Sequence, residues 1–294
     1  MPQKFSQLNP TLWVAQSELY HTNSGIFISE GDVCLVDPAI FPSEIETIAA
    51  FVDDKNVRPR FLVITHHHWD HIFGPEHFPG VNIVAQENYL DEMIGKPGAK
   101  TRKQVQEWEL SHNIKRERSF VIPHPDITFS KTTVLQVGSL SLTLIHSPGH
   151  TSDQLVVYHP ESATLWAADM LSDLEIPFIG HNLAAHEQTL AMIADLDIEM
   201  LVPGHGNPAV GRTEIRSIIS GDIDYLAELR SRVARAISDG KTMEEVVLDC
   251  TAMKYHHPDE NKEAHKLNVE SAYLELGGEA DPSEFGWEKY LYDD

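Results

Sequence analysis

The sequence is poor in cysteine, in basic residues and in long apolar runs, and each shortage excludes a class of protein. Its two cysteines, Cys34 in a strand-like run and Cys250 in a helical one, are interpreted as buried small side chains and not as a disulfide framework. No apolar run approaches the roughly 18 residues that span a bilayer. The first eight residues lack the apolar core of a signal peptide. We therefore expect a cytoplasmic protein with no membrane partner.

The shortage of basic residues sets the net charge. The chain carries 22 Lys and Arg against 45 Asp and Glu, a formal charge of −23. A surface of this sign repels phosphate backbones, so we expect no nucleic-acid partner. Many of the basic residues gather in 96–127, a stretch without clear periodicity that we interpret as an insertion. It could serve as a lid or substrate loop, or it could be a solvated surface excursion.

The order of elements predicts the domain organisation. Residues 1–211 alternate apolar strand-like runs with short helical segments, whereas the pattern of the rest of the chain is helical. A long helical face begins near residue 212 and ends at Gly240, and two shorter helices are expected over 243–253 and 261–276. We predict a catalytic domain over 1–211 and a helical C-terminal appendage over 212–294 that packs on the core.

The densest cluster of metal-binding side chains lies in the run THHHWDH at residues 65–71, directly after an apolar strand-like run. In extended backbone, alternate side chains share a face, so His66 and His68 point the same way and suit one zinc ion. Asp70 and His71 follow at once, and a bend after His68 turns them toward a second ion. The spacing therefore predicts a binuclear site.

Three further apolar runs each end in one more candidate ligand, namely His150, Asp169 and His205. Each run is typical of a strand whose C-terminal loop delivers a single imidazole or carboxylate. Four strand ends then supply one set of nitrogen and oxygen donors, the ligand types that zinc accepts in proteins.

This ordered set resembles the metallo-beta-lactamase superfamily and its glyoxalase II-like metal motif, over roughly the first 210 residues. The resemblance implies an α/β fold, a four-layer αββα sandwich. Carried over by position, it assigns His66, His68 and His150 to the first metal, Asp70, His71 and His205 to the second, and Asp169 to both. It also makes Asp37 an early acidic residue that supports the metal loops, although a turn-forming Asp before proline explains the same residue.

The resemblance implies a hydrolase with two Zn²⁺ ions, with iron or manganese as alternative metals. A metal-bridging hydroxide would attack the carbonyl of a small-molecule substrate. Asp70 is the candidate catalytic residue, which would orient the water and pass a proton to the leaving group. Thr151, Ser152 and Asp153 could orient the imidazoles or form a capped turn, whereas His67 and His146 are expected to lie off the site.

No Lys or Arg occurs between Asp169 and Arg212, so the sequence favours a small neutral ester, lactone or thioester over an anionic substrate. The alternatives are an iron-dependent redox or sulfur-oxygenase enzyme on the same fold, a beta-lactamase, and a non-catalytic metal-binding protein. The oligomeric state stays open, with a dimer as one option. The aromatic tail at 284–290 could dock on a neighbour, close a pocket or fray.

Overall fold

The computed structural model describes residues 4–116 and 119–279, and the strands of this part all lie before residue 211. The strands are β1 (Lys4–Gln7), β2 (Leu12–Gln16), β3 (Asn23–Ser29), β4 (Asp32–Val36), β5 (Arg58–Val63), β6 (Asn82–Gln86), β7 (Ile127–Phe129), β8 (Thr132–Val137), β9 (Leu140–His146), β10 (Leu155–His159), β11 (Thr164–Ala168), β12 (Met200–Pro203) and β13 (Ala209–Val210). The α-helices are α1 (Pro42–Asp54), α2 (Tyr89–Met93), α3 (Gly95–Ser111), α4 (Leu183–Ala194), α5 (Arg212–Ser238), α6 (Met243–Cys250) and α7 (Lys262–Glu275). Short 3₁₀ turns are η1 (Trp69–His71), η2 (Gly74–His77) and η3 (Pro160–Ser162).

The strands form two sheets. The seven-stranded sheet runs β1-β2-β3-β4-β5-β6-β7, and the six-stranded sheet runs β13-β12-β11-β10-β9-β8. The first four strands pair antiparallel as a meander, whereas β4 to β7 pair parallel. In the second sheet, β11 and β12 are the parallel pair. Parallel neighbours end at the same edge, so their C-terminal loops meet there.

The buried side chains of β4 show how the layers are built. Cys34 and Val36 face the second sheet in one apolar cluster, whereas Val33 and Leu35 face the opposite side in another. Helix α1 covers that opposite side with Ile45 and its neighbours. This alternation with a period of two places one apolar layer between the sheets and one beneath α1.

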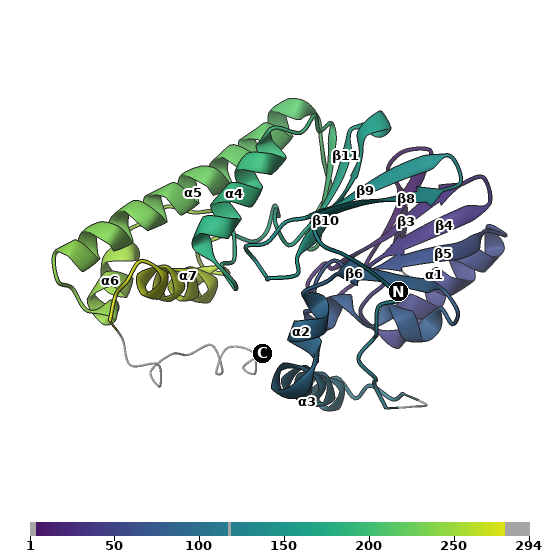
Figure 1. Cartoon of the computed structure of the whole chain (residues 1–294), viewed down its shortest axis with the longest axis horizontal. Helices are drawn as coiled ribbons and strands as arrows, with labels where there is room; N and C mark the ends of the chain where they lie inside the picture. The colour runs from purple at the N-terminus through teal and green to yellow at the C-terminus, as the bar shows by residue number, and fades with distance from the viewer. Residues whose placement is uncertain (1–3, 117–118, 280–294) are drawn as a thin grey trace.

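The second sheet repeats the arrangement. Leu155 and Val157 of β10 face the first sheet, whereas Val156 packs outward with residues of α4 and α5. Figure 1 shows α4, α5, α6 and α7 together on one side of the sheets, away from α1. Helix, sheet, sheet and helix therefore stack in the order that the sequence predicted for an αββα sandwich, with helices added at the C-terminal end.

The C-terminal helices share an apolar cluster with the sheet they cover. Leu165 of β11, Leu190 of α4, Leu226 of α5 and Val269 of α7 all belong to it. The boundary at residue 211 stays a prediction, but the helices after it form much of the outer layer over the second sheet. Both cysteines are buried and unpaired, as expected. No helix among the described residues combines the length and apolar character needed to cross a membrane.

The stretch 96–127, in which the sequence shows no clear periodicity, contains a helix in its first half. Helix α3 runs from Gly95 to Ser111. The interpretation of the stretch as an insertion stays a prediction. Pro97 lies in the first turn, where its missing N–H costs no hydrogen bond. Val105 and Trp108, three positions apart, anchor the helix in the cluster beneath α1. The predicted aromatic tail at 284–290 lies outside the described residues.

Candidate metal centre

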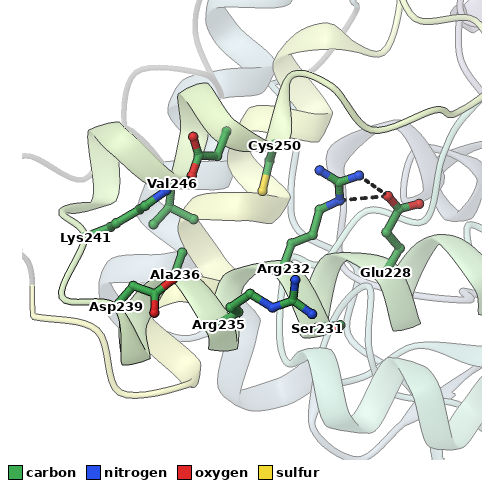
Figure 2. A pocket seen from close by; sticks show the side chains of 10 residues that line it. Glu228, Ser231, Arg232, Arg235, Ala236, Asp239, Lys241, Val246 and Cys250 are labelled. Carbon is green, nitrogen blue, oxygen red and sulfur yellow. Dashed lines mark hydrogen bonds and ion pairs between the residues drawn. The ribbon is translucent and has the colours of Figure 1, made fainter.

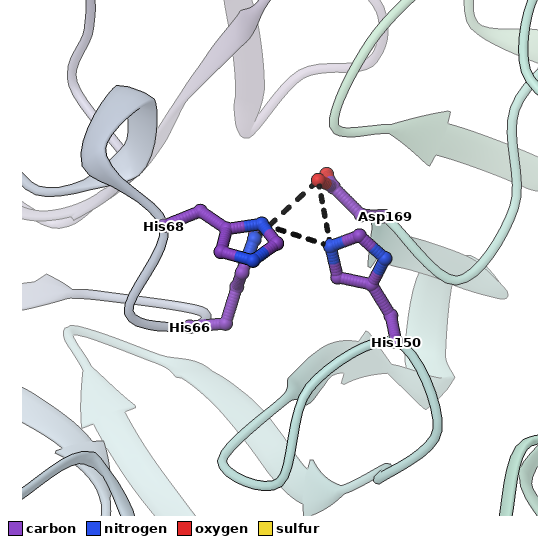
Figure 3. Close-up of side chains that lie close together, drawn as sticks. All are labelled: His66, His68, His150 and Asp169. Carbon is purple, nitrogen blue, oxygen red and sulfur yellow. Dashed lines mark hydrogen bonds and ion pairs between the residues drawn. The ribbon is translucent and has the colours of Figure 1, made fainter. Parts of the chain in front are cut away.

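The predicted ligands converge where strands of both sheets end. His66 and His68 follow β5, and η1 carries Asp70 and His71. The remaining three side chains follow β9, β11 and β12, and they are His150, Asp169 and His205. They form two groups whose donor atoms lie within 4.8 Å of one another: His66, His68, His150 and Asp169 in the first, and Asp70, His71 and His205 in the second. Figure 3 shows the first group, with Asp169 facing the imidazoles.

Asp169 connects the two groups through one oxygen. Its Oδ2 lies 3.4 Å from Nε2 of His66 and 3.5 Å from Nε2 of His150, both in the first group. The same oxygen lies 3.5 Å from Nε2 of His71 and 3.5 Å from Nε2 of His205, both in the second. A carboxylate in this position faces both candidate ion sites, as the resemblance implied for Asp169.

Backbone carbonyls hold two of the imidazoles in orientation. Nδ1 of His150 donates to the Phe178 carbonyl over 3.2 Å, and Nδ1 of His205 donates to the Tyr20 carbonyl over 3.1 Å. Because a carbonyl oxygen only accepts, each Nδ1 must carry a proton, so that in the neutral form of either ring Nε2 is the atom with the free lone pair. This is the tautomer that a metal-binding histidine needs.

Asp37 supports the loop after β5. This favours the interpretation of Asp37 as a residue that supports the metal loops over that of a turn-forming Asp before proline. It is fully buried, and its Oδ1 accepts from the Thr65 backbone N–H over 2.8 Å. Its Oδ2 lies 3.1 Å from Nδ1 of His71 and accepts from the Thr65 hydroxyl. That hydroxyl also lies 3.1 Å from Nδ1 of His66. One buried carboxylate thereby positions a histidine of each group.

The residues fit two metal ions. Nε2 of His66 and Oδ1 of Asp169 are buried without a hydrogen-bond partner among the described residues. Nε2 of His150 lies only 3.0 Å from Nδ1 of His68, so two ring nitrogens point at one place. Buried polar atoms normally find partners. Imidazoles and carboxylates that converge without them suit zinc, and two such groups suit a pair of ions.

Burial keeps two histidines of the first group neutral. It lowers the pKa of His150 to about 3. It also drives the pKa of His68 well below its usual range, with further lowering from the neighbouring His66 and His150. Neutral imidazoles are the form that binds a metal, so these two rings need lose no proton at neutral pH.

The second group is charged in the absence of metal. Burial opposes ionisation of Asp70, but His71 and His205 outweigh it and lower the pKa of that carboxyl to about 2. Burial also opposes a charge on His71, yet the carboxylates of Asp169 and Asp70 raise its pKa well above the usual range. A metal that binds here must therefore displace protons from imidazoles.

Two histidines that the sequence placed off the site are indeed turned away from it. Nδ1 of His67 contacts Oδ1 of Asp153 over 2.7 Å, and His67 belongs to neither ligand group. Nε2 of His146 donates to the Ser152 carbonyl over 2.8 Å. The residues after His150 thus hold neighbouring histidines away from the two ligand groups.

Comparison with known proteins decides the family. A family model described as the metallo-beta-lactamase superfamily matches residues 18–205, which include all seven candidate ligands. The chain belongs to the metallo-beta-lactamase superfamily.

Within this superfamily, the chain is 24% identical over 229 residues to a linear primary-alkylsulfatase from Pseudomonas sp. (strain ATCC 19151), covering 67% of this chain and 43% of the relative. It is 25% identical over 171 residues to the acyl-coenzyme A thioesterase MBLAC2 of Gallus gallus, covering 53% and 59%. The chain thus spans about half the length of these curated relatives. A metallo-beta-lactamase family protein from Thermus thermophilus has the same fold, with a TM-score of 0.67, 20% identity, and 91% and 94% coverage.

One residue that holds the metal centre in place lies after the residues 18–205 that match the superfamily model. Asn268 of α7 is fully buried, and its Oδ1 accepts from the Ile179 N–H over 2.8 Å. Its Nδ2 donates to the Pro177 carbonyl over 2.6 Å and to the Tyr225 hydroxyl over 3.0 Å. These bonds hold the segment that carries the Phe178 carbonyl, the partner of His150. Sequence reasoning missed this residue because nothing in a helical pattern marks one buried amide.

A buried histidine behind the centre was also missed. His186 of α4 is fully buried, and neither ring nitrogen has a partner among the described residues. Burial lowers its pKa to about 3. The ring packs against Gly149, where φ is +148° and an added Cβ would lie 2.5 Å from the His186 Cα. The glycine before His150 is therefore required by the close approach of α4.

Proposed function

We propose that this chain is a metal-dependent hydrolase that cleaves a thioester or ester at a centre of two zinc ions. One observation carries the proposal: Oδ2 of Asp169 lies 3.4 to 3.5 Å from histidine nitrogens of both ligand groups. The likeness to an acyl-coenzyme A thioesterase supports a thioester as the bond that is cleaved. The net charge of −23 supports a small-molecule substrate over a nucleic acid.

Zinc held by these residues would supply Lewis acidity and lower the pKa of water toward roughly 7. The chain's own contribution is positional. Asp37 and the Phe178 and Tyr20 carbonyls fix the imidazole rings, so no reorganisation is needed when the substrate arrives.

Asp70 is the residue to which we assign proton transfer. In the metal-free chain, His71 and His205 lower its pKa to about 2, so the carboxyl group is ionised at neutral pH. An ionised carboxylate here would accept a hydrogen bond from water and orient it. Its contacts with His71 (3.5 Å) and His205 (3.3 Å) use Oδ2. Oδ1 is then the atom at which a proton would be held before it passes to the leaving sulfur or oxygen.

A sulfate ester is the second candidate substrate. The match to a linear primary-alkylsulfatase covers 67% of this chain, more than the match to the thioesterase. Hydrolysis of an alkyl sulfate would use the same residues, with sulfur in place of the carbonyl carbon.

The test measures hydrolysis of five substrates by protein that is loaded with two zinc ions. The substrates are an acyl thioester, a carboxylic ester, a lactone, a beta-lactam and an alkyl sulfate. Asp70→Asn is the matched variant, since it keeps the shape of the side chain and removes the proton acceptor. We expect the thioester or ester to be cleaved and the variant to lose at least about 100-fold in rate. Two bound zinc ions with no cleavage of any substrate would refute the proposal, and iron in place of zinc would favour a redox role.

A further inference from the structure

A cleft of about 790 Å³ opens beside the metal centre. His68 and Trp69, from the loop after β5, form one wall. Lys96, Lys100 and Lys103 of α3 form the other. Because His68 belongs to the first ligand group, a molecule that fills this cleft contacts a residue of the centre. The volume lies in the range of pockets for small molecules.

The charge in this cleft is opposite to that of the chain. Basic residues are outnumbered 22 to 45 in the whole sequence, yet the cleft is lined by three lysines and one carboxylate, Glu92. Glu92 accepts a hydrogen bond from the Ser152 hydroxyl, and Lys103 pairs with Glu107 over 3.4 Å. The side chains of Lys96 and Lys100 form no ion pair or hydrogen bond within 4–116 and 119–279. Two ammonium groups are therefore left without a counter-charge from the described residues.

Helix α3 presents these lysines as a row. Lys96, Lys100 and Lys103 follow at i, i+4 and i+7, so they share one face of the helix. At 1.5 Å of rise per residue, the row is about 10 Å long. Val105 and Trp108 fix the helix in the core, so the row has a defined position relative to the metal loop.

In a second cavity, between α5 and α6, the charged side chains pair with one another, unlike the lysines of the cleft beside the metal centre (Figure 2). It has a volume of about 550 Å³ and contains both signs of charge. Arg232 pairs with Glu228 over 2.7 Å, and Lys241 pairs with Asp249. Four of its charged side chains thus neutralise one another, whereas Lys96 and Lys100 have no such partner in the described part of the chain.

We propose that Lys96 and Lys100 bind an anionic group, a carboxylate or a phosphate, on the substrate whose thioester or ester bond is cleaved at the adjacent centre. The inference rests on the proposed function and specifies its substrate class. It replaces the neutral substrate that the sequence favoured, because that expectation considered only the residues after Asp169. The basic wall comes instead from α3, which precedes that residue by about 70 positions.

The test compares three butyryl thioesters that differ only in their thiol: mercaptopropionate carries a carboxylate, mercaptoethyl phosphate a phosphate, and mercaptoethanol no charge. The variant is Lys96→Gln with Lys100→Gln. The matched control is Arg102→Gln with Lys115→Gln, which removes the same charge from exposed residues outside the cleft. We expect the cleft variant to lose about 10-fold in kcat/KM on an anionic thioester, through KM, and to change less than twofold on the neutral one. The comparison of carboxylate and phosphate identifies which anion is preferred.

An equal loss on the neutral thioester, an equal loss in the control, or no loss at all would overturn the inference while leaving the hydrolase proposal in place. If no thioester is cleaved, only the thioester part of the proposed function fails, and its ester part is still decided by the five-substrate hydrolysis test. The inference is then decided by equilibrium binding of the corresponding butyl thioethers to the zinc-loaded protein. It stands if an anionic thioether binds more weakly to the cleft variant than to the control, and falls if the affinities agree. Raising the salt concentration should also reduce the advantage of the anionic ligands.

Discussion

Replacing Asn268 by Leu should weaken both the fold and one half of the metal centre. The substitution keeps the size of the side chain but removes its three hydrogen bonds. It leaves the Ile179 N–H and the Pro177 carbonyl without partners in a buried environment, at about 1–3 kcal/mol for each stranded group. We expect a total loss of about 3–5 kcal/mol in the free energy of unfolding, a large part of the roughly 5–15 kcal/mol typical of a domain.

The effect on metal binding should be asymmetric. The loosened segment contains Phe178, whose carbonyl orients His150 of the first group, whereas the second group is held by Asp37 and Tyr20. Loss of such outer support typically costs roughly 10- to 100-fold in metal affinity. We therefore expect one zinc ion to bind more weakly by about that factor and the other to bind nearly as before.

The assay combines urea unfolding of the metal-free protein with zinc titration in competition with a chromophoric chelator. Thr242→Ala is the control, because Thr242 caps α6 in the same helical region with a bond to the Glu245 N–H. It should cost about 1 kcal/mol of stability and leave both zinc affinities unchanged. If Asn268→Leu loses stability but binds both ions as tightly as the natural sequence, the proposed link between α7 and His150 is refuted.

Three further predictions concern buried titratable groups. Asp37→Asn should weaken zinc binding about 10- to 100-fold, measured by the same competition titration, and unchanged affinity would show that its contacts with Thr65 and His71 do not matter for the metal. Lowering the pH from about 8 to about 6 should release zinc from the second group first, because the raised pKa of His71 lets protons compete with the metal there. In the first group, His150 has a pKa of about 3 and stays neutral over this range. Simultaneous release of both ions would contradict this prediction. Burial raises the pKa of Asp222 well above its usual value. As the pH rises through about 3.9, the carboxyl group loses its proton in the unfolded state but keeps it in the native state. The free energy of unfolding therefore falls from that pH up to the native pKa. Asp222→Asn removes this loss, so unfolding should show it more stable than the natural sequence at about pH 7 and the gap should close toward about pH 4.

The sequence predicted those parts of the site that depend on local geometry. His66 and His68 were expected to lie together, and the structure places both in one group, although they lie in a bend after β5 and not in the strand itself. The apolar runs before His150, Asp169 and His205 end at the same edge because strands of a layered fold end together. The supports were harder to predict. The Phe178 carbonyl has no side-chain signature, and Asn268 meets its partners across about 90 residues of chain.

Helix α3 was missed for a different reason. Its apolar positions are few, with only Val105 and Trp108 buried among large side chains, so no helical period stands out. Its first turns contain Pro97 and Gly98, residue types that usually interrupt or end a helix. Gly98 is present because an added Cβ would lie 2.0 Å from the Met93 carbonyl oxygen, a packing requirement that one sequence cannot display.

The separation between Asn268 and the segment it holds has a consequence for synthesis on the ribosome. Ile179 and Pro177 are made about 90 residues before their partner. At roughly 5–20 residues per second, every candidate ligand exists for several seconds before α7 leaves the ribosome. During that interval the nascent chain can collapse around β5 and β11, but His150 lacks its final support. The order of translation thus separates the synthesis of the ligands from the completion of the centre, so a metal ion that binds before release would meet a His150 without its final support.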